Sequence, residues 1–147
     1  MEDRDLYKAK RIDNGEWAIG NLIQNSDAED GWEAIIIPVK NSNMFTKHIG
    51  HGYGSLGFEN WYRVDSSTIC RCTGLKDKHG KLIWKNNIIK TRVGTAKVVW
   101  DKSEWRIEWL KNELWRKDLY YWAVDDIQKA EVIGNIFDNP ELLESEG

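Results

Sequence analysis

The stretch that decides the fold is TGLKDKHGKLIWKNNIIK, residues 73–90. Its centre, Asp77-Lys78-His79-Gly80, combines polar side chains with a glycine at the last position, which is typical of a tight turn. Short runs rich in branched apolar residues at 82–84 and 87–93 predict strands, and Gly94 ends the second one. The stretch therefore predicts a strand, a turn and a strand, followed by another strand that enters a barrel-like sheet.

Short strand patterns continue on both sides of this stretch. Residues 6–11 and 17–22 flank Asp13-Asn14-Gly15, which tolerates positive φ and predicts a hairpin. Residues 95–100 and 105–109 form the clearest hairpin, because apolar and charged side chains alternate along the second strand. Further strands are expected at 32–39, 61–64, 119–124 and 131–137, and a long glycine-rich hairpin tip is expected at 41–57. The pattern contains no long amphipathic helix, so the fold class is mostly β.

A polar turn at residues 65–68 predicts the boundary between two small β sub-domains, residues 1–67 and residues 68–147. Five or six short strands with tight turns follow this boundary and favour an SH3-like barrel for the C-terminal sub-domain. Residues 139–143 predict a short C-terminal helical turn, because asparagine suits the N-cap and proline the first helical position.

The composition indicates a globular chain. Of the 147 residues 41% are hydrophobic, which is enough to fill a core. Nine are Trp, which indicates either two compact β cores or aromatic side chains left on a surface for binding. No apolar run approaches the length of roughly 20 residues that a membrane helix needs, and the acidic N-terminus lacks the apolar core of a secretory signal. We therefore expect a cytoplasmic protein with no membrane partner.

The two cysteines, Cys70 and Cys72, are expected to be reduced thiols. They point to the same face of one strand, where a disulfide between them would be strained. Together with His48 and His51 they contain the residue types of a zinc site, but their spacing is too short for a zinc knuckle and the histidines fall in the other sub-domain. We expect core thiols and no metal or other cofactor.

Positive charge is concentrated in the middle of the chain. The net charge is −3, yet residues 71–102 carry nine Lys or Arg against two Asp or Glu. Residues 1–34 and 123–147 are both acidic. One interpretation is self-complementarity, in which the acidic ends meet the basic centre of the same chain or of a second subunit. The other interpretation is an anion-binding surface.

The basic stretch and the C-terminal segment resemble one protein family. Residues 72–81 and 83–90 are similar to the signature of YopX-like phage and prophage proteins, and residues 131–143 follow the C-terminal pattern of that family. Cys72 stands where an aromatic residue is common, and Asn87 stands where an aspartate is common, so a role for that acid is absent here. The resemblance implies a β-rich, two-part fold, a phage or prophage origin, a bacterial host cell and a homo-oligomer. It implies no biochemical activity.

The sequence favours a non-catalytic interaction module over an enzyme. Ser66, Ser67 and Thr68 lie in a turn that explains their hydroxyls, and no nucleophile elbow or phosphate-binding glycine-rich loop is present. Asp125 and Asp126 are adjacent, which does not suit a catalytic carboxylate pair. The expected partner is a second copy of the chain or another protein.

The alternative function is single-stranded nucleic-acid binding by the basic centre of the C-terminal barrel. Lys78, Lys81 and Lys85 would neutralise phosphates, and Trp84 would stack on an unpaired base. The competing interpretation places these lysines on a solvated surface and the tryptophan in the core.

Overall fold

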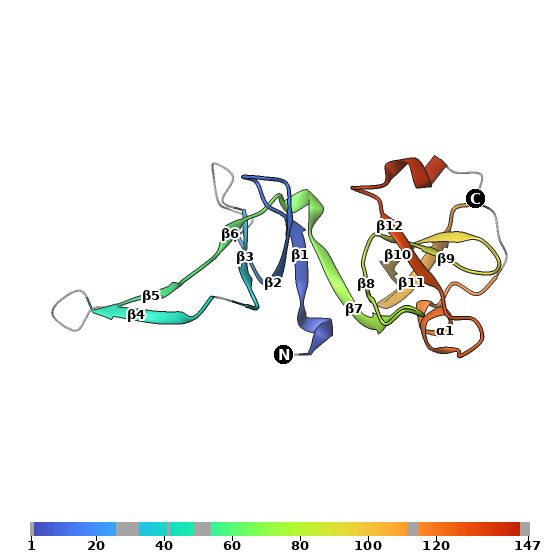
Figure 1. Ribbon diagram of the computed structural model, residues 1–147, viewed down its shortest axis with the longest axis horizontal. Coiled ribbons are helices and arrows are strands. Elements are labelled where there is room, and N and C mark those ends of the chain that lie inside the picture. The colour runs from blue at the N-terminus through green and yellow to red at the C-terminus, as the bar shows by residue number, and fades with distance from the viewer. Residues whose placement is uncertain (1, 26–32, 41, 49–53, 112–114, 145–147) are drawn as a thin grey trace. The chain divides into compact units, whose positions relative to one another are not determined.

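The protein is described by a computed structural model that covers residues 2–25, 33–40, 42–48, 54–111 and 115–144 (Figure 1). It is mostly β and divides into two compact units. The N-terminal unit is Leu6–Ile69, and the C-terminal unit combines Met1–Asp5 with Cys70–Gly147. The division lies two residues beyond the boundary predicted from sequence, and the first residues of the chain belong to the C-terminal unit.

An antiparallel sheet forms the body of the N-terminal unit. The strand order is β6 (Tyr62–Arg63), β3 (Ala34–Pro38), β2 (Trp17–Gln24), β1 (Tyr7–Lys10). The predicted hairpin of β1 and β2 is confirmed, with Gly15 at φ +73 in its turn. The core is a small cluster of Ala9, Ala18, Ala34, Ile36 and Val64. The polar turn predicted at residues 65–68 is confirmed as the 3₁₀ turn η2 (Ser66–Thr68), in which the Asp65 side chain accepts a hydrogen bond from the Ser67 N–H.

A second hairpin belongs to the same unit. Strands β4 (Met44–His48) and β5 (Gly54–Phe58) pair with each other in antiparallel fashion, which confirms the predicted long hairpin. Residues 44–48 and 54–57 of the tip predicted at 41–57 are therefore paired strands, and residues 49–53 lie outside the described residues. Phe45 lies opposite Gly57, and its ring fills the place where a side chain at residue 57 would stand. Met44 and Leu56 are both exposed.

The C-terminal unit contains six of the strands. They are β7 (Cys70–Lys76), β8 (Leu82–Trp84), β9 (Asn87–Lys90), β10 (Thr95–Asp101), β11 (Glu104–Trp109) and β12 (Glu131–Asn135). β7 and β8 form the hairpin predicted from the opening stretch, and the other four form an antiparallel sheet in the order β11-β10-β9-β12. The hairpin of β10 and β11 is confirmed. Closure of these strands into an SH3-like barrel stays a prediction.

Branched aliphatic side chains and tryptophans fill the core of this unit. Ile83, Ile89, Val98 and Ile107 are buried and surround Trp122. The Trp109 and Trp122 rings meet edge to face with their centroids 5.5 Å apart, a favoured aromatic arrangement. Cys70 and Cys72 are buried and form no disulfide, which confirms that both are core thiols.

One predicted strand is wrong. Residues 119–124 form a helix, α1 (Leu119–Val124), with Leu119, Trp122 and Ala123 buried. These positions are spaced i, i+3 and i+4, which places them on one face of a helix. The short C-terminal helical turn is confirmed as the 3₁₀ helix η3 (Pro140–Glu144). At the other end of the chain the 3₁₀ helix η1 (Asp3–Asp5) packs on β7, where Arg4 lies against Gly74.

Candidate functional site

Asp77, in the turn of the opening stretch, holds together the backbone segments next to the candidate site. The Asp77 side chain is only 4% exposed. Its Oδ1 accepts hydrogen bonds from the backbone N–H groups of His79 and Lys81, both at 2.9 Å, and Oδ2 accepts one from Val132 at 3.0 Å. Asp77 therefore closes the turn after β7 and also joins that turn to β12.

These hydrogen bonds set the ionisation of Asp77. Burial by itself raises the pKa of the carboxyl group, but the N–H groups of Val132, Lys81 and His79 favour the charged form. A positive charge on His79 acts in the same direction. The pKa of Asp77 consequently lies below its ordinary value, and the group is an ionised structural carboxylate at neutral pH.

Asparagines of the family signature also act as turn-forming residues. Asn87 Oδ1 accepts a hydrogen bond from the Trp84 backbone N–H at 2.8 Å, which closes the turn between β8 and β9. Asn135 Oδ1 accepts from the N–H groups of Phe137 and Asp138, both at 2.9 Å. The amide at residue 87 supplies an acceptor, as a carboxylate at that position would. The family motif is thus accounted for by structure.

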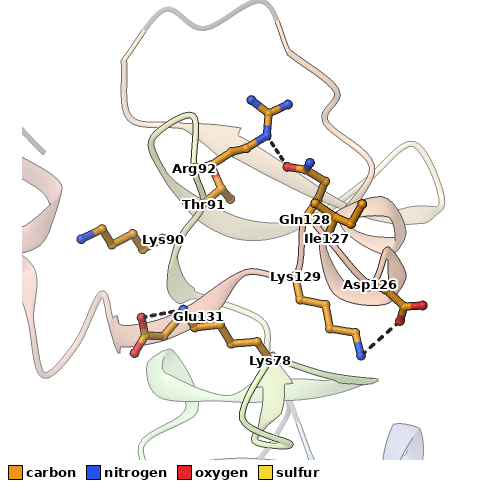
Figure 2. Close-up of a pocket in the computed structure, with 9 residues that line it drawn as sticks. All are labelled: Lys78, Lys90, Thr91, Arg92, Asp126, Ile127, Gln128, Lys129 and Glu131. Atoms are coloured by element: carbon orange, nitrogen blue, oxygen red, sulfur yellow. Dashed lines mark hydrogen bonds and ion pairs between the residues drawn. The ribbon is translucent and has the colours of Figure 1, made fainter.

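An open pocket of about 630 Å³ lies beside the Asp77 turn (Figure 2). Its walls come from four segments of the C-terminal unit: the turn after β7, the end of β9, the turn after α1 and the start of β12. The lining residues are Lys78, Lys90, Thr91, Arg92, Asp126, Ile127, Gln128, Lys129 and Glu131. We call it the cationic pocket, because four of these residues are basic and two are acidic.

Backbone hydrogen bonds hold the walls of the cationic pocket together. Lys78 donates its N–H to the carbonyl oxygen of Ala130 at 3.0 Å, next to Lys129 and Glu131. Lys90 lies directly opposite Glu131 across the ladder of β9 and β12. The fold thereby brings together residues that are far apart in the sequence.

A buried threonine orders the end of β9. Thr91 Oγ1 donates to the Gly94 carbonyl at 2.9 Å and accepts from the N–H groups of Val93 and Gly94, both at 3.1 Å. This turn fixes the backbone on either side of Thr91. Lys90 and Arg92, which flank the threonine, are both exposed.

The ion pairs in the cationic pocket are long and solvated. Lys78 Nζ is 3.7 Å from Glu131, and Lys129 Nζ is 3.9 Å from Asp126. Exposed pairs of this kind contribute little to stability, so they leave the cations available to other anions. Figure 2 shows Arg92 bonded to Gln128, and Lys90 extending outward with no partner among the residues drawn.

An exposed aromatic ring stands next to the cationic pocket. The guanidinium of Arg92 lies 5.2 Å from the centre of the Trp115 ring, within cation–π range. Trp115 is 47% exposed, and its backbone carbonyl accepts a hydrogen bond from Trp109 Nε1 at 3.3 Å. The next carbonyl, of Arg116, accepts from Trp122 Nε1 at 3.0 Å. Two core indoles thus anchor the backbone that carries this ring.

The structure separates the four residues predicted to bind nucleic acid. Lys78 lines the cationic pocket, whereas Lys81 and Lys85 lie outside it. Trp84 is 6% exposed in the core, so its ring offers no face to a base, and the predicted stacking role is wrong for this residue. Lys129 and Trp115 were missed, because they lie in other segments of the sequence and only the fold brings them near this stretch.

Among the described residues no group of three His, Cys, Asp or Glu is placed to hold a metal ion. His51 of the zinc hypothesis lies outside them. None of the described helices is long and apolar enough to cross a membrane.

Comparison with known proteins identifies the family. Residues 7–144 match the family described as YopX protein, so the chain belongs to the YopX family. None of the curated proteins matches the sequence. The chain is similar in structure to the protein EF1440 from Enterococcus faecalis, with a TM-score of 0.55 and 21% sequence identity. That alignment covers 93% of this chain and 96% of EF1440, so the likeness extends over both units and concerns the fold.

Proposed function

We propose that this YopX-family chain is a non-catalytic interaction module, encoded by a phage or prophage and acting in the host cytoplasm. Its partner in this proposal is a second copy of the same chain, bound through the N-terminal unit. One observation carries the proposal: an apolar hollow of about 330 Å³ between the sheet and the second hairpin of that unit.

The hollow is lined almost entirely by apolar groups. Ile23 and Ile35 come from β2 and β3, Leu56 and Phe58 come from β5, and Trp61 follows them. Leu56 is 61% exposed, and Ile23 and Trp61 are also exposed. Grouped apolar exposure of this kind marks interaction sites more often than scattered exposed residues do.

The second hairpin supports a second copy as the occupant. Within the described residues β4 and β5 pair only with each other, and a two-stranded hairpin is marginally stable alone in water. An open strand edge is also a template for pairing with another chain. Two identical hairpins related by a twofold axis would cover each other's edges and apolar faces in one contact.

The titratable groups favour binding over catalysis. Burial raises the pKa of Asp118, but Arg116 outweighs it with two hydrogen bonds of 2.9 and 3.0 Å, so this pKa lies below its ordinary value. The Asp77 carboxylate accepts hydrogen bonds from three backbone N–H groups. Both carboxylates therefore have structural roles that explain their ionisation.

Light scattering coupled to size exclusion tests the proposal. The wild-type chain is expected to exceed its monomer mass of 17.2 kDa at high concentration. Leu56→Glu places a charge in the hollow and is expected to give a monomer. Tyr120→Glu is the matched control, because Tyr120 is similarly exposed but lies in the other unit. A wild-type protein that stays monomeric at the highest soluble concentration would refute self-association.

A further inference from the structure

We propose that the cationic pocket and Trp115 together form a binding site for single-stranded nucleic acid. The pocket would hold backbone phosphates, and the Trp115 ring would stack on an adjacent base. This inference concerns the C-terminal unit and does not depend on self-association through the N-terminal unit.

The net positive charge of the cationic pocket is complementary to the negative charge of a phosphodiester. Lys78, Lys90, Arg92 and Lys129 surround a space that also contains Asp126 and Glu131, so the lining carries two net positive charges. The pocket is accessible, because all four cations are exposed. Since the ion pairs to the two carboxylates are 3.7 and 3.9 Å long, a phosphate oxygen can replace either carboxylate at little cost.

Arg92 is the residue that connects phosphate binding to base stacking. Its Nε is engaged by Gln128, which fixes the direction of the guanidinium. The terminal nitrogens keep N–H groups in a planar fork that suits phosphate oxygens. The same guanidinium lies against the Trp115 ring. A nucleotide whose phosphate bonds Arg92 would therefore have an aromatic surface within reach of its base.

Base stacking requires an exposed aromatic ring, which Trp115 has and the buried Trp84 does not. Its ring is about half exposed, whereas its backbone is held by the indole N–H groups of Trp109 and Trp122 at two successive carbonyls. A ring on an ordered backbone loses little conformational freedom when a base stacks on it. Stacking recognises any base, so the expected ligand is an unpaired strand of unrestricted sequence.

Fluorescence anisotropy with a labelled oligothymidine of about 20 nucleotides measures this binding in the full-length protein. Four neutralised phosphates give a slope of log affinity against log salt of about −2.8 for a single strand. Raising the salt from about 50 to about 200 mM should then weaken binding roughly 50-fold. Lys90→Glu combined with Arg92→Glu should weaken binding at least about tenfold and roughly halve the slope.

The matched control is Lys81→Glu combined with Lys85→Glu. It changes the charge by the same amount within the same basic stretch, but neither residue lines the pocket, so affinity should stay within about twofold. Trp115→Ala should weaken binding roughly 5- to 150-fold with an unchanged salt slope, because stacking involves no counterion release. Urea midpoints of all variants separate loss of binding from loss of folding.

Three results would overturn the inference. One is the absence of oligonucleotide binding by the wild-type chain in dilute buffer. Another is an equal loss of binding in the Lys81 and Lys85 variant, or an unchanged affinity in Trp115→Ala. The third is equally tight binding of a polyglutamate peptide that is lost on the Lys90 and Arg92 substitutions, because the pocket would then be a site for acidic protein segments. Since light scattering reports self-association separately, either proposal can fail without the other.

Discussion

Replacing Asp77 by alanine should destabilise the C-terminal unit more than any exposed carboxylate substitution. The change removes the acceptor of three backbone N–H groups, those of His79, Lys81 and Val132. An N–H group left without its partner costs about 1–3 kcal/mol, and water can reach part of this turn, so the lower value applies to each. The expected loss is about 3 kcal/mol, a large share of the 5–15 kcal/mol that holds a typical domain together.

Urea unfolding followed by tryptophan fluorescence measures this loss. Six of the nine tryptophans lie in the C-terminal unit, so the signal reports mainly on it. With a urea dependence of about 1–3 kcal/mol per M, the midpoint of Asp77→Ala should fall by roughly 1–3 M. Asp77→Asn keeps one oxygen acceptor and should lose less than the alanine variant. Asp126→Asn is the control and should leave the midpoint unchanged, because that carboxylate is 97% exposed.

The pH dependence of the unfolding free energy gives a second test of the role of Asp77. Because the pKa of Asp77 is lowered in the folded protein, its stabilisation is fully present above the unfolded pKa of about 4. It is lost as the pH falls through the lower folded pKa. The difference in unfolding free energy between wild type and Asp77→Ala should therefore shrink on acidification below about pH 4. A constant difference between neutral and acidic pH, or midpoints equal to that of Asp126→Asn, would refute the role assigned to Asp77.

Three other substitutions or measurements test the packing. Gly20→Ala should destabilise the N-terminal unit, since its methyl group would stand 2.0 Å from the Ile37 carbonyl oxygen, whereas Gly94→Ala meets nothing within 4 Å and should be neutral; urea unfolding followed by far-UV circular dichroism, which reports on both units, measures both variants. Trp122→Ala should cost about 3–5 kcal/mol, because the side chain is fully buried, and a loss under about 1 kcal/mol in urea unfolding would contradict its place in the core. Both thiols should react with Ellman's reagent only in denaturant, because Cys70 and Cys72 are buried, so rapid reaction of the native protein would contradict this burial.

The local sequence pattern was sufficient to predict the hairpins. The strict alternation of residues 105–109 and the Asp-Asn-Gly turn at 13–15 each depend on neighbouring residues, and β11 and the turn between β1 and β2 follow from them. The run LYYWAV at 119–124 consists of apolar and aromatic residues along its whole length, so six residues do not distinguish a period of two from one of 3.6. Burial of Leu119, Trp122 and Ala123 against the core decides for the helix.

The candidate site was only partly predictable, because it is assembled from distant segments. Lys78, Lys90 and Arg92 belong to the basic stretch, and the concentration of positive charge there indicated an anion-binding surface. Lys129 lies in an acidic segment, and no sequence pattern links it to Lys78. The link is the hydrogen bond from Lys78 to the Ala130 carbonyl, together with the bond from Val132 to Asp77.

The membership of η1 in the C-terminal unit has a consequence for synthesis of the chain. Arg4 lies against Gly74, and the Arg71 guanidinium donates to the Arg4 carbonyl across a separation of 67 residues. A ribosome therefore releases η1 long before β7 emerges, and all of Leu6–Ile69 is translated in between. The N-terminal unit can fold during that interval, whereas η1 cannot pack on β7 until translation has passed the middle of the chain.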